Sequence, residues 1–278
     1  MEIRINGDVA DIQLEAEKTI GEILSALDAW LAGTGHRLSG LCINGEQVSA
    51  GLMEESFIRE IDTVKTLDII TSSLPELLAE SLCSLLQDLD TFEQTGFSEK
   101  APFLAQWKES PEAKLLAEQC SDLFKWAILT FSGEGSNPQI LRMMAEERLR
   151  ELRDPAGELA KAGPVVAEIS NRLEEFPLDM QTGKDARAAE TIDAFTGITE
   201  KLIRGYNILK MEGYPVGEIK IDDMPVDSYM ADFNSALRDL LAAYEQHDTV
   251  LAGDIAEYEI APRLRNLHAA MINSIAGE

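Results

Sequence analysis

The chain has 278 residues, of which 45% are hydrophobic and 27% are charged, proportions that are ordinary for a globular protein of two domains. Its formal net charge of −26 is unusual, because 50 acidic residues stand against 24 basic ones. This charge repels the phosphates of nucleic acids and the anionic surfaces of membranes, so neither is expected as a partner. A basic protein partner stays open, beside the simpler interpretation of a solvated acidic surface.

Cysteine usage points to a cytoplasmic protein. Cys42, Cys83 and Cys120 are odd in number and far apart, and no Cys-x-x-Cys occurs, so we expect reduced thiols. The chain opens directly with a strand, and no apolar run approaches about 18 residues. We therefore expect neither a signal peptide nor a transmembrane helix, and a cytoplasmic location.

The first residues follow the pattern of a β-hairpin. Residues 2–5 alternate polar and apolar side chains, as a half-buried strand does. Asn6-Gly7 tolerates the positive φ angles of a two-residue turn. Residues 10–15 alternate again, which predicts the return strand.

One helix and further strands are expected next. Thr19 and Glu22 have the spacing of a capping box, and apolar residues then recur at helical spacing until the glycines of residues 33–35. Strand residues flank a second turn at Asn44-Gly45, and residues 64–70 have the β-branched composition of a final strand. One helix laid across such a sheet buries one face of each.

Three stretches carry a family resemblance: MEIRINGDVADIQLEAEKTIGEIL at the start, LCINGEQV in the middle and TLDIIT at the end. In this order they resemble the ubiquitin-like β-grasp superfamily, over about the first 72 residues. The resemblance implies a β-grasp fold but no single function, since β-grasp domains serve as modifiers, sulfur carriers and docking modules. Modifiers and sulfur carriers end in a free Gly-Gly. This chain instead runs on through Thr71–Leu74, so neither conjugation nor sulfur transfer is supported.

The resemblance also implies a candidate interaction surface. Ubiquitin presents an exposed apolar patch beside basic residues, and the matching positions here are Cys42, Asp68 and Ile70, with Glu46 in place of a lysine. The patch is partly kept but its charge is altered, so the partners of ubiquitin itself are not expected. These three residues are the candidate interaction surface of the N-terminal part.

Helical spacing dominates the remaining chain. Gly163-Pro164 is expected to kink or split one of the helices there, and Phe176-Pro177 to close it. Asp227 is expected to cap a later helix and Pro262 to bend the last one, while residues 218–226 have the pattern of a loop or one short strand. Apolar stripes, separated by Gly, Pro and Asp, predict helices over about 74–94, 101–108, 111–132, 138–153, 155–176, 184–211, 227–244 and 250–275.

The expected fold class is α+β. A ubiquitin-like β-grasp domain occupies residues 1–73 and an acidic, all-helical bundle domain occupies residues 74–278. Short connections predict that consecutive helices are antiparallel neighbours. The bundle is expected to subdivide, if anywhere, near residues 133–137 or at residue 154.

No motif for catalysis, a cofactor or a metal is found. The most suggestive pair, Asp254 and Tyr258, lies four residues apart on one helical face beside apolar residues. A carboxylate in an apolar stripe could be an acid with a raised pKa or a metal ligand. The repeated Glu-x-x-His motif of di-metal bundles is missing, however. A buried, structural polar cluster is therefore the favoured interpretation.

These patterns favour a non-catalytic interaction or adaptor protein that works without a cofactor. It would dock a protein partner through the sheet around Cys42 and Ile70, or through a groove between helices. One alternative is a secretion or flagellar-type export chaperone that holds an amphipathic client helix, which a long exposed apolar groove would support. Another is an enzyme with an unrecognised site near Asp254. The identity of the partner and the oligomeric state stay open.

Overall fold

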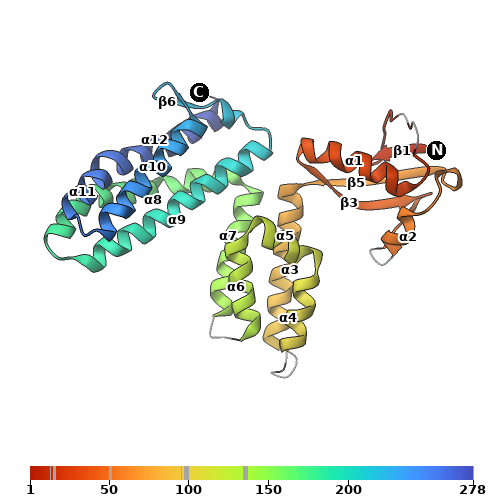
Figure 1. The fold of residues 1–278 in the computed structure, drawn as a ribbon, viewed down its shortest axis with the longest axis horizontal. Helices are drawn as coiled ribbons and strands as arrows, with labels where there is room; N and C mark the ends of the chain where they lie inside the picture. The colour runs from red at the N-terminus through yellow and green to blue at the C-terminus, as the bar shows by residue number, and fades with distance from the viewer. Residues whose placement is uncertain are drawn as a thin grey trace. The chain divides into compact units, whose positions relative to one another are not determined.

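The computed structural model describes residues 1–12, 14, 17–49, 52–94, 96, 100–133 and 137–277. The predicted fold class is confirmed, since an N-terminal mixed sheet is followed by helices (Figure 1). The chain divides into two compact units, residues 1–149 and residues 150–278.

The N-terminal sheet has a mixed topology. Its strands are ordered β2-β1-β5-β3-β4, with β1 parallel to β5 and the other neighbours antiparallel. Helix α1 (Ile20–Thr34) lies across the sheet, and Ile20, Ile23 and Leu24 pack on buried strand residues (Figure 1). The arrangement is compatible with a β-grasp. The strands are β1 (Glu2–Ile5), β2 (Asp8–Val9), β3 (His36–Ile43), β4 (Glu46–Gln47) and β5 (Thr66–Ser73).

Both Asn-Gly turns have the backbone that the sequence predicts. Asn6 and Gly7 have φ angles of 53° and 87°, and the same pair at residues 44–45 has 54° and 87°. The return strand β2 is shorter than predicted, because the Ile12 N–H bonds the carbonyl of Ala10 and bends the chain there. Of the predicted strand 10–15, residues 13 and 15 lie outside the described residues.

Caps set both ends of α1. The Glu22 N–H donates to Thr19 Oγ1 and the Thr19 N–H donates to the Glu22 carboxylate, both at 3.3 Å, so the predicted capping box is confirmed. Gly35 ends the helix in the left-handed conformation with φ 75°. Two short segments, α2 (Met53–Phe57) and η2 (Ile61–Thr63), connect β4 to β5.

Strand β5 passes directly into helix α3 (Leu74–Gln94). At the junction the Glu76 carboxylate accepts hydrogen bonds from the N–H and the hydroxyl of Ser73, at 2.8 and 2.9 Å. These bonds lower the pKa of Glu76. An exposed ion pair between Arg37 and Glu118, at 2.9 Å, also links β3 to the following helices within the first unit.

Helices fill the rest of the first unit. The predicted single helix over 111–132 is wrong, because Cys120, with φ −136° and ψ 59°, separates two helices. Between Leu116 and Leu123 the only apolar residues are Ala117 and Cys120, so the apolar stripe is interrupted there. Phe92, Phe103, Trp107 and Phe131 form an aromatic cluster between the helices. The helices are α4 (Lys100–Glu109), α5 (Pro111–Gln119), α6 (Ser121–Ser132) and α7 (Pro138–Arg153), the last crossing the boundary between the units.

The second unit is built on two long helices, α8 and α9, which pack against each other (Figure 1). A single hydrophobic core joins them to the later helices. Its elements are α8 (Pro155–Gln181), α9 (Asp185–Met211), η4 (Pro215–Glu218), β6 (Lys220–Ile221), β7 (Met224–Pro225), α10 (Val226–Glu245), α11 (Thr249–Asp254), η5 (Ile255–Ile260) and α12 (Ala261–Ala276).

Helix α8 is not split at Gly163-Pro164, and the prediction that Phe176-Pro177 closes it is wrong. Helix α8 runs without interruption through Pro164 and Pro177 to Gln181. Each proline removes one backbone hydrogen bond, but Val166 and Leu173 are buried between them and hold the helix by tertiary packing. Packing thus overrides the local helix-breaking tendency.

Asp227 does not cap α10, which begins one residue earlier, at Val226. The Asp227 carboxylate instead accepts a hydrogen bond from the Tyr206 hydroxyl at 3.0 Å. Burial and this carboxylate together raise the pKa of Tyr206 to about 12. The segment before α10 forms a two-strand hairpin, β6–β7, rather than a loop or one strand.

The last helix changes character before Pro262. Residues Ile255–Ile260 adopt the wider π-helical pattern, and α12 follows directly. Pro262 has no amide hydrogen, so it cannot donate to the carbonyl of Tyr258 in a regular helix. The π-helical stretch takes up this mismatch, and the bend at Pro262 stays a prediction.

Candidate functional site

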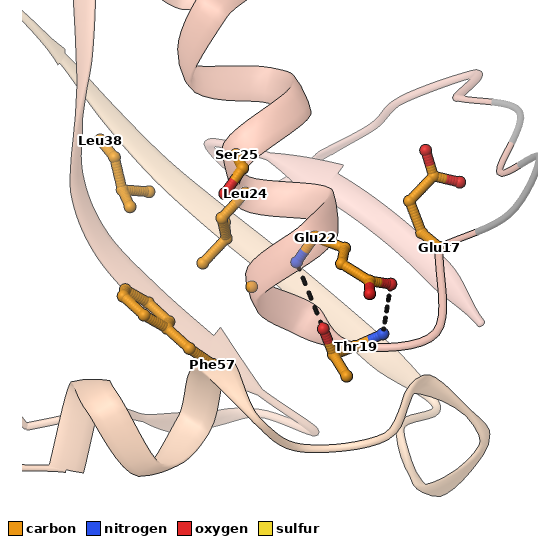
Figure 2. A pocket seen from close by; sticks show the side chains of 8 residues that line it. Glu17, Thr19, Glu22, Leu24, Ser25, Leu38 and Phe57 are labelled. Atoms are coloured by element: carbon orange, nitrogen blue, oxygen red, sulfur yellow. Dashed lines mark hydrogen bonds between the residues drawn. The ribbon is translucent and has the colours of Figure 1, made fainter.

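A wide hollow of about 890 Å³ lies beside the N-terminal end of α1 (Figure 2). Leu24, Leu38 and Phe57 point toward its interior, while Thr19 and Glu22 lie at one side. The capping box uses these polar groups, since the Glu22 carboxylate also accepts from the Lys18 N–H at 2.5 Å. The contacts of Thr19 and Glu22 are therefore explained by the start of the helix.

A second hollow, which we call the α9–α10 groove, lies in the helical unit and has a volume of about 250 Å³. Its surface is mostly apolar and comes from two helices. Its lining residues are Ile192, Phe195, Thr196, Thr199, Glu200 and Ile203 of α9, and Asn234, Leu237, Leu240, Leu241 and Tyr244 of α10.

Helical spacing explains how the sequence builds the α9–α10 groove. The lining positions of each helix recur at intervals of three or four residues, so they form one stripe on each helix. The Phe195 and Phe233 rings meet edge to face at 6.1 Å and join the two helices below the groove. Phe195 and Leu240 form a buried floor, whereas Leu241 is 56% exposed at the mouth.

Thr199 has an unusual environment in the α9–α10 groove. Its side chain is buried, with 5% exposure, and its hydroxyl has no hydrogen-bond partner in the part of the chain that the structure describes. Two other threonines of α9, Thr191 and Thr196, donate to the carbonyls four residues earlier, each at 2.9 Å. The hydroxyl of Thr199 makes no such bond, so it is a buried polar group without a hydrogen-bond partner among the described residues.

The helical unit that contains the α9–α10 groove has more acidic than basic residues. Residues 150–278 contain 24 acidic and 13 basic residues, a net charge of −11. On α9, Lys201 and Arg204 are held by Glu151 and Glu158 from the neighbouring segments, within 3.4 Å. Glu200 belongs to the lining of the groove and also lies 3.9 Å from Arg204.

The structure brings the predicted surface residues of the sheet together. Cys42 on β3 is the register partner of Asp68 on β5, and Ile70 lies opposite Gly40. All three predicted side chains are half-buried, and the Asp68 carboxylate accepts from the Gly7 N–H at 3.0 Å. They share the sheet face that points away from α1. Their role in an interaction stays a prediction.

The predicted burial of Asp254 and Tyr258 is wrong. Asp254 is exposed and Tyr258 is 65% exposed, because Ala252, Ala256 and Ile260 occupy the inward-facing positions of this segment. A hydrogen bond to the neighbouring carboxylate of Glu257 raises the pKa of Tyr258. The hypothesis of an enzyme site near Asp254 assumed a carboxylate enclosed by apolar side chains, and the exposed Asp254 does not meet this assumption.

Within the described ranges, no cluster of three or more His, Cys, Asp or Glu side chains is placed to hold a metal ion. In the same ranges no helix is long and apolar enough to cross a membrane.

Sequence reasoning did not single out the residues of the α9–α10 groove. The apolar stripe predicted for the helix over 227–244 includes Leu237, Leu240, Leu241 and Tyr244. The adjacent pair Leu240-Leu241 was the available signal, since two neighbouring residues point about 100° apart on a helix and both seldom face the same core. Leu240 is buried and Leu241 lies at the mouth.

Comparisons with known proteins match two stretches of the chain. Residues 1–73 match the model of the TP0873 N-terminal domain, and residues 158–270, which contain the whole α9–α10 groove, match a domain of unknown function, DUF8042. No ubiquitin-like family is recognised at the N-terminus. An uncharacterized protein of Treponema pallidum (strain Nichols) is 23% identical over 277 residues, covering 100% of this chain and 99% of the relative. No solved structure matches the chain.

Proposed function

We propose that this is a non-catalytic binding protein whose α9–α10 groove holds the apolar face of a helix from a protein partner. The observation that carries the proposal is the exposure of Leu241, at 56%, directly beside the buried floor formed by Phe195 and Leu240. Exposed leucine next to a preformed hollow is typical of sites that bury an amphipathic helix.

The dimensions of the α9–α10 groove suit a helix better than a small molecule. The lining residues of α9 run from Ile192 to Ile203, about 16 Å at 1.5 Å per residue. Apolar anchors at positions i, i+4 and i+7 of a bound helix span about 10 Å, so they fit along this length. The volume of 250 Å³ is below the range of about 300–1,000 Å³ that is usual for small-molecule pockets.

Charge favours a basic partner. The net charge of −11 on residues 150–278 attracts cationic segments and raises the rate at which they meet the groove. The expected ligand is thus an amphipathic helix with leucine-like residues on one face and Lys or Arg on the flanks. Both a folded partner and an unfolded export client can present such a helix, so the export-chaperone function is a second candidate with the same site.

The N-terminal domain supplies a second surface for the adaptor function. We propose that it is a ubiquitin-like β-grasp docking module, which binds through the sheet face of Cys42, Asp68 and Ile70. The clustering of these side chains on one face supports this part of the proposal.

The test uses the full-length protein and a labelled 18-residue helical peptide with leucine on one face and lysine on its flanks. Leu241→Asp is expected to weaken binding at least about tenfold, because it puts a charge where the peptide buries a leucine. Leu251→Asp is the matched control, since Leu251 is 48% exposed on α11, outside the groove lining, and the substitution adds the same charge. Equal peptide affinity for wild type and both variants would contradict the proposal.

A further inference from the structure

We infer that Asn44 is a site of slow covalent modification, at which the backbone nitrogen of Gly45 attacks the side-chain amide and releases ammonia. Asn6 precedes Gly7 in the other Asn-Gly turn of the sheet, and the fold protects it from the same reaction. The inference concerns the first unit and does not depend on the α9–α10 groove.

The two Asn-Gly turns form a matched pair in sequence and in backbone conformation. Residues 5–8 read Ile-Asn-Gly-Asp and residues 43–46 read Ile-Asn-Gly-Glu. The φ angles are 53° and 87° in the first turn and 54° and 87° in the second. The N–H of Asn6 donates to the Ile69 carbonyl at 3.0 Å and that of Asn44 to the Thr66 carbonyl at 2.8 Å, so each turn is joined to β5. Glycine has no Cβ to hinder attack by its own nitrogen, so the two sites have the same intrinsic reactivity.

The reaction has two steps and consumes one water molecule from the solvent. The nitrogen of Gly45 forms a bond to Cγ of Asn44 and loses its proton to water, while the Cγ–Nδ2 bond breaks and the side-chain nitrogen leaves, protonated, as ammonia. The five-membered succinimide then takes up water at either of its carbonyls and opens to Asp or to isoaspartate, without oxidation or reduction. The side-chain amide must first leave its hydrogen bonds, because Cγ has to turn toward the glycine nitrogen.

At Asn6 the fold holds all three groups that take part in the reaction. The Oδ1 atom accepts from the Thr71 N–H at 2.8 Å, and the Nδ2 atom donates to the Thr71 hydroxyl at 3.1 Å. The attacking nitrogen, that of Gly7, donates to the Asp68 carboxylate at 3.0 Å. Thr71 and Asp68 both belong to β5, at the centre of the sheet, and Thr71 is buried. Three hydrogen bonds, one of them to a charged group, must therefore break before Asn6 reacts.

At Asn44 the fold holds one of the three groups. The Oδ1 atom accepts from the N–H groups of Lys65 and Thr66, at 2.7 and 3.2 Å. Within the described residues, the Nδ2 atom of Asn44 and the N–H of Gly45 make no hydrogen bond. Both residues are exposed, so water reaches the leaving group and the attacking nitrogen. Release of a single oxygen atom thus opens the site, and Asn44 reacts before Asn6.

The products change the turn in two ways. Asp at residue 44 places a negative charge where the structure has a neutral amide. Isoaspartate routes the backbone through Cγ and so adds one methylene group to the turn between β3 and β4. Because β4 pairs with β3 through residues 46 and 47 alone, the longer turn is expected to loosen this edge strand.

The experiment follows both asparagines in the same full-length protein. The chain is kept in mildly alkaline buffer, and peptide mapping by mass spectrometry measures Asp and isoaspartate at residues 44 and 6 over time. In the folded protein, residue 44 is expected to react at least about fivefold faster, the factor that one hydrogen bond of ordinary net strength contributes to an opening equilibrium. In concentrated urea the two rates are expected to agree, because the two sequences are alike.

Thr71→Val tests the protection of Asn6 directly. It removes the hydroxyl that holds Nδ2 of Asn6 and keeps the backbone N–H that holds Oδ1. The rate at residue 6 is expected to rise by about fivefold, and the rate at residue 44 to stay unchanged. If both rates rise, the sheet has opened, and Asp68→Ala, which removes the acceptor of the Gly7 N–H, takes its place.

Three results would overturn the inference. Equal rates in the folded protein, or a faster reaction at residue 6, would show that the hydrogen bonds around Asn6 do not protect it. A faster reaction at residue 44 that persists in urea would come from the sequence and not from the fold. No rise at residue 6 in either variant would show that its anchors to β5 do not control the reaction.

Discussion

The ion pair between Glu151 and Arg204 is expected to be a main determinant of the stability of the second unit. Glu151 is 2% exposed, and Arg204 donates to both of its carboxylate oxygens, from Nε at 2.9 Å and from a terminal nitrogen at 3.0 Å. Removing one partner of a buried pair typically costs about 3–5 kcal/mol. Arg204 is partly exposed and Lys201 still lies 3.4 Å from Glu151, so we expect a cost of about 2.5 kcal/mol for Arg204→Ala.

Urea unfolding measures this cost unit by unit. All five tyrosines lie in residues 150–278 and all three tryptophans lie in residues 1–149, so tyrosine absorbance and tryptophan fluorescence report different units. At a slope of about 2 kcal/mol per molar urea, Arg204→Ala should lower the tyrosine-monitored midpoint by about 1.2 M. The tryptophan-monitored midpoint should stay the same.

Arg265→Ala is the control for this prediction. Arg265 pairs with Glu174 where both side chains are roughly 40% exposed, and its removal should cost less than about 1 kcal/mol. Equal shifts of the tyrosine-monitored midpoint for Arg204→Ala and Arg265→Ala would refute the reasoning, since burial would then not decide the cost.

Two further predictions concern backbone packing and pH. Gly253→Ala should destabilise the second unit by about 1–3 kcal/mol, because a Cβ there would lie 2.9 Å from Cβ of Pro177. Gly197→Ala should stabilise the unit by up to about 1 kcal/mol, because a Cβ there would have no neighbouring atom within 4 Å. The tyrosine-monitored midpoint of urea unfolding measures both changes. Because the pKa of Tyr206 is raised to about 12 and its unfolded value is near 10, its contribution to stability is complete below about pH 10 and is lost as the pH rises to about 12. Spectrophotometric titration should show one tyrosine at this high pKa, and Asp227→Asn should lower that pKa; an unchanged titration curve would contradict the assignment.

Local patterns in the sequence were enough to predict the Asn-Gly turns and the start of α1. Asn6-Gly7 and the Thr19–Glu22 box act through bonds within a few residues, and the structure contains both as predicted. The same holds for the general division into a sheet followed by helices. The boundary between the predicted domains at residue 73 stays a prediction, while the compact units divide after residue 149.

The sequence-based predictions failed where contacts between residues far apart in the chain determine the local structure. Pro164 and Pro177 were expected to interrupt a helix, but burial of neighbouring residues such as Leu173 keeps α8 continuous. Asp227 has the local chemistry of a cap, yet its partner, the Tyr206 hydroxyl, is 21 residues away. The sequence patterns also did not predict the α9–α10 groove, because its lining residues come from two helices that the η4–β7 segment separates in the chain.

The direct passage from β5 into α3 has a mechanical consequence. Strand β5 is bonded along one side to β1 in parallel and along the other to β3, and it ends at Ser73, where α3 begins. Because β1 runs parallel to β5, a force that pulls residue 1 and α3 apart loads the β1–β5 ladder in shear, so the backbone hydrogen bonds along its four register pairs resist it together. Tension on the helices would thus reach the centre of the sheet, and this junction would transmit force instead of acting as a loose tether.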